Sequence, residues 1–192
     1  MTNHPKIWFL RHGETKWNRA GRLQGQLDSP LTDRGIADGE RQRSIMAPIL
    51  ATQPALFASP LGRAQQTARI ALGGQTYHTD PRLMEIHAGT GEGQTREAVL
   101  AAHPELVARN ATALEIFAAS AQAETLAEFH ARIRSFLSDL TGPSVIVAHG
   151  LLGQVLRAEV RGYPLEQAGM LSNRQGVVYV LDRRVEQVLE AP

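Results

Sequence analysis

The sequence predicts an α/β fold with a mostly parallel central sheet. Two apolar runs, Ile7–Leu10 and Ser144–Ala148, have the length and composition of strands buried on both faces of a parallel sheet. A His-Gly pair follows closely after each run, and segments with helical spacing lie between the strands. Ligands bind at the carboxyl ends of the strands in open α/β sheets. Both His-Gly pairs are therefore expected at one rim of the sheet.

Composition excludes several classes of protein. The 192 residues suffice for one domain with a sizeable core, and the net charge of +1 gives no basic footprint for nucleic acid. No apolar run approaches the length that spans a membrane, and residues 1–6 are polar, unlike a signal peptide. The absence of cysteine excludes disulfides, thiolate metal sites and cysteine nucleophiles. We expect a cytoplasmic protein that binds neither nucleic acid nor membranes.

The first part of the chain is expected to continue as loop, helix and strand. Residues 19–35 are rich in Gly, Asp, Ser and Pro, a composition typical of a loop. Thr32 is a suitable N-cap for a helix that ends near Ala51. The apolar segment Ala55–Ala58 then predicts a second strand, and residues 75–79 predict a further short one.

Arg63 is the next residue with a candidate role. Ser59 is expected to cap the helix that follows the second strand, and Pro60 suits its first turn. Arg63 would then lie in the opening turn, where free backbone N–H groups and the helix dipole favour anions. A single helix arginine more often makes a surface ion pair, so its role depends on the motifs around it.

Residues 95–140 are predicted to be helical throughout, with a break before Pro104. The Ala-rich part, residues 106–123, has few large apolar side chains and is expected to form a small cap over the strand ends. Thr125 and Glu128 have the spacing of a capping box. The helix that follows carries one apolar stripe, typical of a helix packed on a core: Phe129, Ile133, Phe136, Leu137 and Leu140.

The second His-Gly pair repeats the arrangement of the first. A helix is predicted to begin at Leu151, so that His149 stands between a buried strand and a helix N-terminus. A lone histidine beside a strand usually has a structural role. The repetition of a strand followed by His-Gly favours a functional role for His149. Residues 173–181 predict a loop and a strand, and a terminal hairpin is expected through residues 185–189.

Four motifs of the chain resemble those of one known family. They are Arg11-His12-Gly13-Glu14-Thr15, Ser59-Pro60-Leu61-Gly62-Arg63-Ala64, Glu85 followed by Glu92-Gly93, and His149-Gly150. Together they resemble the histidine phosphatase superfamily, which also contains the cofactor-dependent phosphoglycerate mutases. The resemblance covers essentially the whole chain. It implies a three-layer α/β/α sandwich of phosphoglycerate mutase-like topology, forming one domain over residues 1–192 with a cap insertion at about 95–123.

The resemblance implies phosphoryl transfer through a phosphohistidine. His12 would be the nucleophile, and Glu85 would protonate the leaving group and then activate water. The choice of His12 over His149 comes from the resemblance, because spacing alone does not distinguish them. Three side chains would hold the phosphoryl oxygens: Arg11, Arg63 and His149. Three further residues are expected to line the phosphate pocket: Asn18, Gln24 and Gly150. A turn cap at Asn18 and a solvated side chain at Gln24 remain open alternatives.

The segments that would contact the rest of the substrate match the family least. Gly91 stands where the family commonly has Trp, and Leu151 where Gly or Val is common. Only 63 residues separate Glu85 from His149. The mutases of the family carry longer insertions over the site, so the short span favours a phosphatase. Four cations in this span are candidate substrate contacts: Arg96, Arg109, Arg132 and Arg134.

The predicted activity is hydrolysis of a small phosphorylated metabolite without a metal or a cofactor. No histidines have His-x-x-x-His spacing, so a metal hydrolase is a weaker alternative. A phosphoglycerate mutase and a non-catalytic phosphate-binding regulatory protein are the others. The expected partner is a small-molecule phosphomonoester, and the oligomeric state is open, with a homodimer as one option. A neutral nucleophile paired with a protonated carboxyl group predicts a bell-shaped pH dependence.

Overall fold

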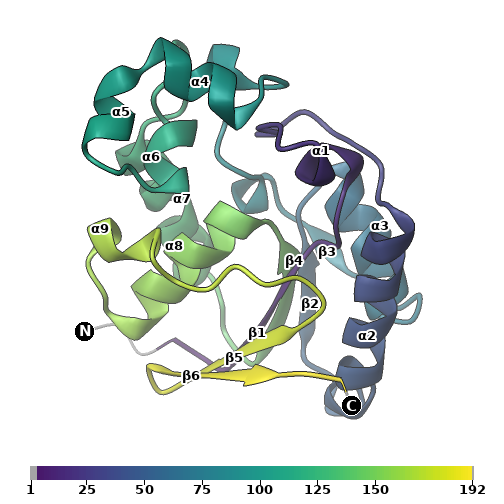
Figure 1. Cartoon of the computed structure of the whole chain (residues 1–192). Coiled ribbons are helices and arrows are strands. Elements are labelled where there is room, and N and C mark those ends of the chain that lie inside the picture. Colours follow the sequence, from purple (N-terminus) through teal and green to yellow (C-terminus); the bar gives the residue numbers. More distant parts are fainter. Residues whose placement is uncertain (1–3, 192) are drawn as a thin grey trace.

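A six-stranded mixed sheet lies at the centre of the computed structural model, which describes residues 4–191 (Figure 1). The strands are β1 (Ile7–Arg11), β2 (Ala55–Ala58), β3 (His78–Thr79), β4 (Ser144–Ala148), β5 (Val178–Asp182) and β6 (Val185–Leu189). Their spatial order is β3-β2-β4-β1-β5-β6. β1 to β4 are parallel, and β5 and β6 form an antiparallel pair at one edge. The mostly parallel α/β fold is therefore confirmed.

Helices cover both faces of this sheet. α2 (Asp33–Leu50) and α3 (Gly62–Ala71) lie on one face, and α7 (Leu126–Ser138) and α8 (Gly150–Arg161) lie on the other (Figure 1). The three-layer sandwich expected from the sequence is confirmed. It leaves the carboxyl ends of β1, β2 and β4 open for a ligand.

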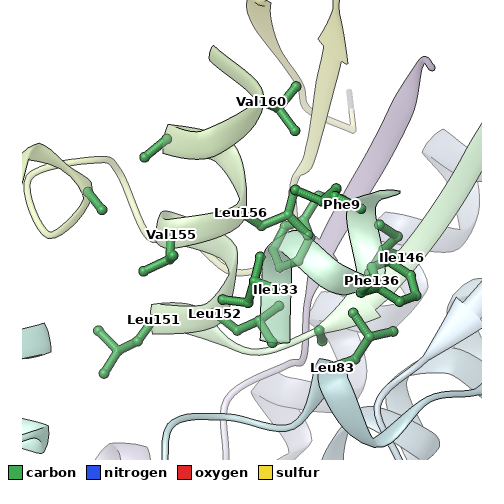
Figure 2. Close-up of a cluster of buried hydrophobic side chains, with 14 of the residues drawn as sticks. Phe9, Leu83, Ile133, Phe136, Ile146, Leu151, Leu152, Val155, Leu156 and Val160 are labelled. Atoms are coloured by element: carbon green, nitrogen blue, oxygen red, sulfur yellow. The ribbon is translucent and has the colours of Figure 1, made fainter. Parts of the chain in front are cut away.

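The alternation of side chains along β1 explains the two cores. Ile7 and Phe9 point into the core beneath α7 and α8, and Trp8 and Leu10 point into the core beneath α2 and α3. Figure 2 shows the first of these cores, with Phe9 packed between the sheet and α8. Gly153 makes this possible, because a Cβ at that position would collide with the Phe9 ring.

Three short helices form a separate layer above the strand ends. They are α4 (Arg96–Ala102), α5 (Pro104–Ala108) and α6 (Ala113–Phe117), at the top of Figure 1. They enclose a small apolar cluster of their own: Leu23, Ala88, Val99, Leu106 and Ile116. The predicted break at Pro104 is confirmed, since α5 begins there.

The expectation of helix throughout residues 95–140 is wrong. The segment 118–125 between α6 and α7 is not helical. Gln122 within it has a positive φ of 62°, which a right-handed helix does not allow. Thr125 then caps α7 through the predicted capping box with Glu128. Alanine-rich composition alone therefore overestimated the helix content here.

Two predicted element boundaries also differ from the structure. α3 begins at Gly62 after Leu61, so Ser59 does not cap it. The Ser59 hydroxyl instead contacts His149 on the neighbouring strand end. β3 contains His78 and Thr79 alone, because residues 73–75 still form turns that continue from α3.

The remaining elements are short. They are α1 (Lys16–Arg19), α9 (Leu165–Ala168) and the 3₁₀ turns Pro81–Leu83 and Gly89–Gly91. Across residues 4–191, no helix combines the length and the apolar character needed to cross a bilayer.

Candidate active site

The predicted site residues meet at the carboxyl ends of β1, β2 and β4. A cavity of about 200 Å³ lies there. Four of the five predicted catalytic residues line it, as do the three predicted binding residues: Arg11, His12, Arg63, Glu85, Asn18, Gln24 and Gly150. His149 lies beside them, with its ring centroid 5.3 Å from that of His12 in an edge-on arrangement. Residues as far apart in the sequence as Arg11 and Asn173, which are 162 positions apart, thus line one small cavity.

His12 is held as a neutral imidazole with a defined tautomer. Its Nδ1 is 2.8 Å from the carbonyl oxygen of Gly13, which can only accept, so Nδ1 carries the proton. Nε2 therefore has a lone pair, and Arg63 Nε donates to it at 3.3 Å. Burial, followed by the charges of Arg63 and Arg11, lowers the pKa of His12 well below its ordinary value of 6.5. A neutral imidazole with this lone pair has the form that a nucleophile requires.

Arg63 is held in place by hydrogen bonds within the protein. Its guanidinium donates to the carbonyl oxygens of Gly25 and Leu27, each at 2.7 Å, and to Asp28 Oδ1 at 3.2 Å. The side chain is almost completely buried. These contacts link the first turn of α3 to the 25–28 loop. They hold a positive charge against His12 without further rearrangement.

The guanidinium group of Arg11 is anchored through one nitrogen atom, and another of its nitrogen atoms has no acceptor in the described chain. Its Nη1 donates to the carbonyl oxygen of Asn173 at 2.6 Å. Its Nε is buried and has no hydrogen-bond partner among residues 4–191. Gly150 leaves room for this arrangement, since a Cβ there would come within 3.1 Å of Arg11 Nε and closer still to the Asn173 side chain. Burial lowers the pKa of Arg11, but a guanidinium stays charged at neutral pH.

His149 is completely buried beside this donor. Its Nε2 lies 2.7 Å from Ser59 Oγ, and its Nδ1 has no hydrogen-bond partner within the described part of the chain. Burial, followed by the charge of Arg63, lowers the pKa of His149 well below 6.5. Two buried nitrogen atoms next to His12, on Arg11 and His149, thus lack acceptors. Buried polar groups without partners are uncommon, so this pair indicates a place for the oxygen atoms of a ligand.

Glu85 occupies the N-terminus of α8. Its Oε1 accepts from the backbone N–H groups of Leu152 at 2.9 Å and of Ile86 at 3.2 Å, and its Oε2 accepts from Leu151 at 3.0 Å. The carboxyl group is buried, yet Glu85 still lines the cavity. The same helix start therefore orients Glu85 and carries His149 as its N-cap residue.

Arg132 has a positioning role that the sequence did not indicate. It donates to the carbonyl oxygens of Met84 at 2.7 Å and Glu85 at 3.0 Å, and it forms a two-point ion pair with Glu124. Glu124 also accepts from the backbone N–H of His87. The expectation of a substrate contact at Arg132 is therefore wrong, because this guanidinium braces the loop that carries Glu85.

Of the other three candidate cations, two lie away from the cavity and one lines it. Arg109 pairs with Glu115 and Arg134 with Glu159, away from the cavity. Arg96 lines the cavity, and its side chain has no hydrogen bond or ion pair to residues 4–191. Arg22 lines it as well, and donates to the carbonyl oxygen of Gly93 at 2.6 Å. Arg22 was not predicted, because a loop arginine carries no specific signal.

Asn18 and Gln24 line the cavity and are also tied to the first motif. The Asn18 side chain accepts from the backbone of Thr15, which gives α1 a capping box. Gln24 Nε2 donates to Thr15 Oγ1 at 2.8 Å. Asn18 is thus both a cap and a cavity residue, so the two alternatives considered for it coexist. Gln24 is buried, which contradicts a solvated side chain.

Glu92, in the Glu-Gly pair noted in the sequence, joins two loops of the site. Its Oε1 accepts from Gln26 at 2.7 Å and from Ala88 at 3.2 Å. A Cβ at Gly25 would overlap this carboxylate. Glu92 therefore connects the 25–28 loop, which anchors Arg63, to the loop that follows Glu85. Within residues 4–191, no group of three or more metal-ligating side chains is found.

Comparisons with known proteins agree with this architecture. A family model described as histidine phosphatase superfamily (branch 1) matches residues 7–189. A protein of Yersinia pestis named probable phosphoglycerate mutase GpmB is 34% identical over 168 residues, which cover 83% of this chain and 76% of that one. A mycobacterial glucosyl-3-phosphoglycerate phosphatase structure has 27% identity and a TM-score of 0.82, covering 98% and 100% of the two chains. The Bacillus stearothermophilus YhfR structure has 28% identity and a TM-score of 0.79, covering 97% and 96%. The chain belongs to the histidine phosphatase superfamily.

Proposed function

We propose that the protein is a phosphomonoesterase that hydrolyses a small phosphorylated metabolite through a phosphohistidine at His12. One observation supports this most directly. Arg63 Nε donates to the lone pair of His12 Nε2, and two buried nitrogen atoms of the same site, Arg11 Nε and His149 Nδ1, have no hydrogen-bond partner in the described chain. A bound phosphoryl group would supply oxygen acceptors to these donors and an electrophile to the imidazole.

The proposed reaction has two steps. His12 Nε2 attacks phosphorus, the bond between phosphorus and the leaving oxygen breaks, and Glu85 gives that oxygen a proton. Water then attacks the phosphohistidine, Glu85 takes the proton from the water, and the P–N bond breaks to release inorganic phosphate. Arg11, Arg63 and His149 bind the phosphoryl oxygens, where charge is spread in the transition state. Each cycle returns His12 and Glu85 to their starting states.

Hydrolysis is favoured over mutase activity by the size of the cap. Three short helices form it, and the cavity beneath it holds about 200 Å³. A mutase must retain its substrate while excluding water, and a cap of three short helices offers less cover for this than the longer insertions expected of the family's mutases. The mutase alternative has two observations in its favour. One is the 34% identity to a Yersinia pestis protein named probable phosphoglycerate mutase. The other lies in the cavity. Arg22 and Arg96 both line the cavity and could hold a second anionic group of a phosphoglycerate.

The direct test measures both activities. Purified protein is expected to release inorganic phosphate from p-nitrophenyl phosphate and from members of a panel of metabolite phosphomonoesters. In parallel, the interconversion of 2- and 3-phosphoglycerate is followed with the same preparation. Interconversion that exceeds net hydrolysis would make the protein a mutase. Tight phosphate binding without turnover on the whole panel would favour a binding protein.

The pKa of His12 predicts how activity depends on pH. In the unfolded chain a histidine titrates near 6.5. Because burial and the adjacent arginines lower the pKa of folded His12, it stays neutral as the pH falls through 6.5. After correction for substrate ionisation, kcat/KM is expected to hold at pH 6.5 and to fall only at lower pH, when His12 gains a proton.

A histidine NMR titration of the free protein checks this directly. A His12 midpoint at or above 6.5 would contradict the prediction. Stability must be measured over the same range, because the unfolded chain takes up these protons first as the pH falls below about 6.5. The free energy of unfolding then decreases with falling pH, and unfolded protein would imitate a loss of catalysis.

A further inference from the structure

Ser59 and His149 form a buried pair at the ends of adjacent strands. β2 and β4 are parallel with Ala58 opposite Val147, so Ser59, the residue after β2, comes level with Ala148 and one position from His149. The backbone N–H of Ser59 donates to Val147, and Ser59 Oγ lies 2.7 Å from His149 Nε2. Both side chains are completely buried. The contact is set by strand register and not by a flexible loop.

Proton counting assigns the direction of this hydrogen bond. Ser59 Oγ already accepts from the backbone N–H of Leu61 at 3.3 Å. Within the described chain, His149 Nε2 is the one acceptor within reach of the Ser59 hydroxyl proton. If Nε2 carried a proton of its own, that buried hydroxyl would donate to nothing, which is unfavourable. The satisfied arrangement is Ser59 O–H donating to Nε2, with the imidazole proton on Nδ1.

The position of this proton matters at the phosphoryl site. His149 Nδ1 is buried without a partner, and the ring stands edge-on to the ring of His12. With a proton, Nδ1 can donate to a phosphoryl oxygen bound at His12. Without one, its lone pair would face those oxygens and repel them. The low pKa of His149 keeps the ring neutral, so the tautomer decides between these two cases.

We propose that Ser59 is a positioning residue that holds His149 in the Nδ1–H tautomer, and so makes it a hydrogen-bond donor to the transferring phosphoryl group. The proposal rests on the proposed phosphatase function for its kinetic consequence. The proton position itself is a property of the free protein. Ser59 does not line the cavity, and acts through His149 alone.

The test compares three variants by NMR and kinetics. Ser59→Ala removes the hydroxyl, and Ser59→Thr retains it. Ser144→Ala is the matched control, because Ser144 is equally buried at the opposite end of β4 and its hydroxyl donates to the carbonyl oxygen of Gly142. Side-chain ¹⁵N shifts of histidine report the tautomer. Steady-state hydrolysis of p-nitrophenyl phosphate reports kcat/KM, and thermal unfolding shows that each variant is folded.

We expect His149 in the wild type to have a protonated Nδ1 and an unprotonated Nε2. In Ser59→Ala both tautomers become populated, and kcat/KM falls about tenfold, the equivalent of one hydrogen bond. Ser59→Thr recovers the wild-type ¹⁵N pattern and rate, and Ser144→Ala changes neither. An Nε2–H tautomer in the wild type overturns the proposal, as does a Ser59→Ala variant with an unchanged ¹⁵N pattern, whatever its rate. A wild-type protein that shows the expected tautomer but hydrolyses no phosphomonoester would refute the proposed function instead.

Discussion

Replacing His12 by alanine is expected to lower kcat for p-nitrophenyl phosphate by about 10⁴-fold or more. Without the imidazole no covalent intermediate can form, and the remaining groups can only bind and polarise the ester. Arg11 and Arg63 are anchored by contacts that do not involve His12, so binding of inorganic phosphate is expected to persist. The measurement is the steady-state rate together with ³¹P NMR of alkali-denatured protein, which reports phosphohistidine.

The matched control for this variant is His78→Ala. His78 is an exposed histidine on the edge strand β3, outside the cavity. Its replacement is expected to leave the rate and the phosphohistidine signal unchanged. A His12→Ala protein within tenfold of the wild-type rate would remove His12 as the nucleophile, and phosphorylation found on His149 would reassign that role.

Replacing Glu85 by glutamine is expected to separate the two steps of the reaction. p-Nitrophenolate is a good leaving group and needs little protonation, so His12 is still phosphorylated. Hydrolysis of the phosphohistidine requires a base for water, and should slow by about 10²- to 10⁴-fold. Stopped-flow measurements should then show a burst of one p-nitrophenolate per active site, followed by slow turnover. A steady-state rate within tenfold of wild type would contradict the proposed role.

The same variant should be less stable. Both oxygens of Glu85 accept from backbone N–H groups, and a glutamine amide offers one oxygen and one donor. Either Leu151 or Leu152 then loses its acceptor, at a cost of about 1–3 kcal/mol in the free energy of unfolding. Glu128→Gln is the matched control, since Glu128 also accepts from the backbone at a helix N-terminus but lies on the exposed side of α7. Glu128→Gln should also lower the free energy of unfolding, but by less, and it should show no burst of p-nitrophenolate.

The residues with strong local signals were predictable from the sequence. Apolar runs identified β1 and β4, and the His-Gly pairs after them gave the position of the site, because parallel strands bring their carboxyl ends together. Thr32 and Thr125 marked helix starts through their hydroxyl groups, and both prove to be N-caps. These features depend on spacing within a few residues, which a sequence displays directly.

The supporting contacts were not predictable, because their partners are distant in the chain and are often backbone atoms. Arg132 donates to the carbonyl oxygens of residues 82, 84 and 85. Every residue has a carbonyl oxygen, so the identity of these residues gives no sign that they accept this hydrogen bond. Ser59 has the composition of a helix cap, but the register of β2 against β4 turns it to His149 instead. Arg96 and Arg109 have equal charge and similar surroundings in sequence. Only the packing of α4 to α6 decides which one faces the cavity.

The small apolar cluster beneath α4, α5 and α6 has a consequence for how enzymes of this shape diversify. Its members, Leu23, Ala88, Val99, Leu106 and Ile116, form a nucleus apart from the two cores that hold the sheet. The layer is still tied to the sheet through α6, because Leu114 is buried in the core beneath α7 and α8. An exchange of residues 96–117 that retains Leu114 would therefore reshape the entrance while β1, β4 and α8 keep their packing. Natural variation or laboratory grafting at the other positions of this segment would then change what the cavity admits, while Arg11, His12 and His149 keep their places at the strand ends.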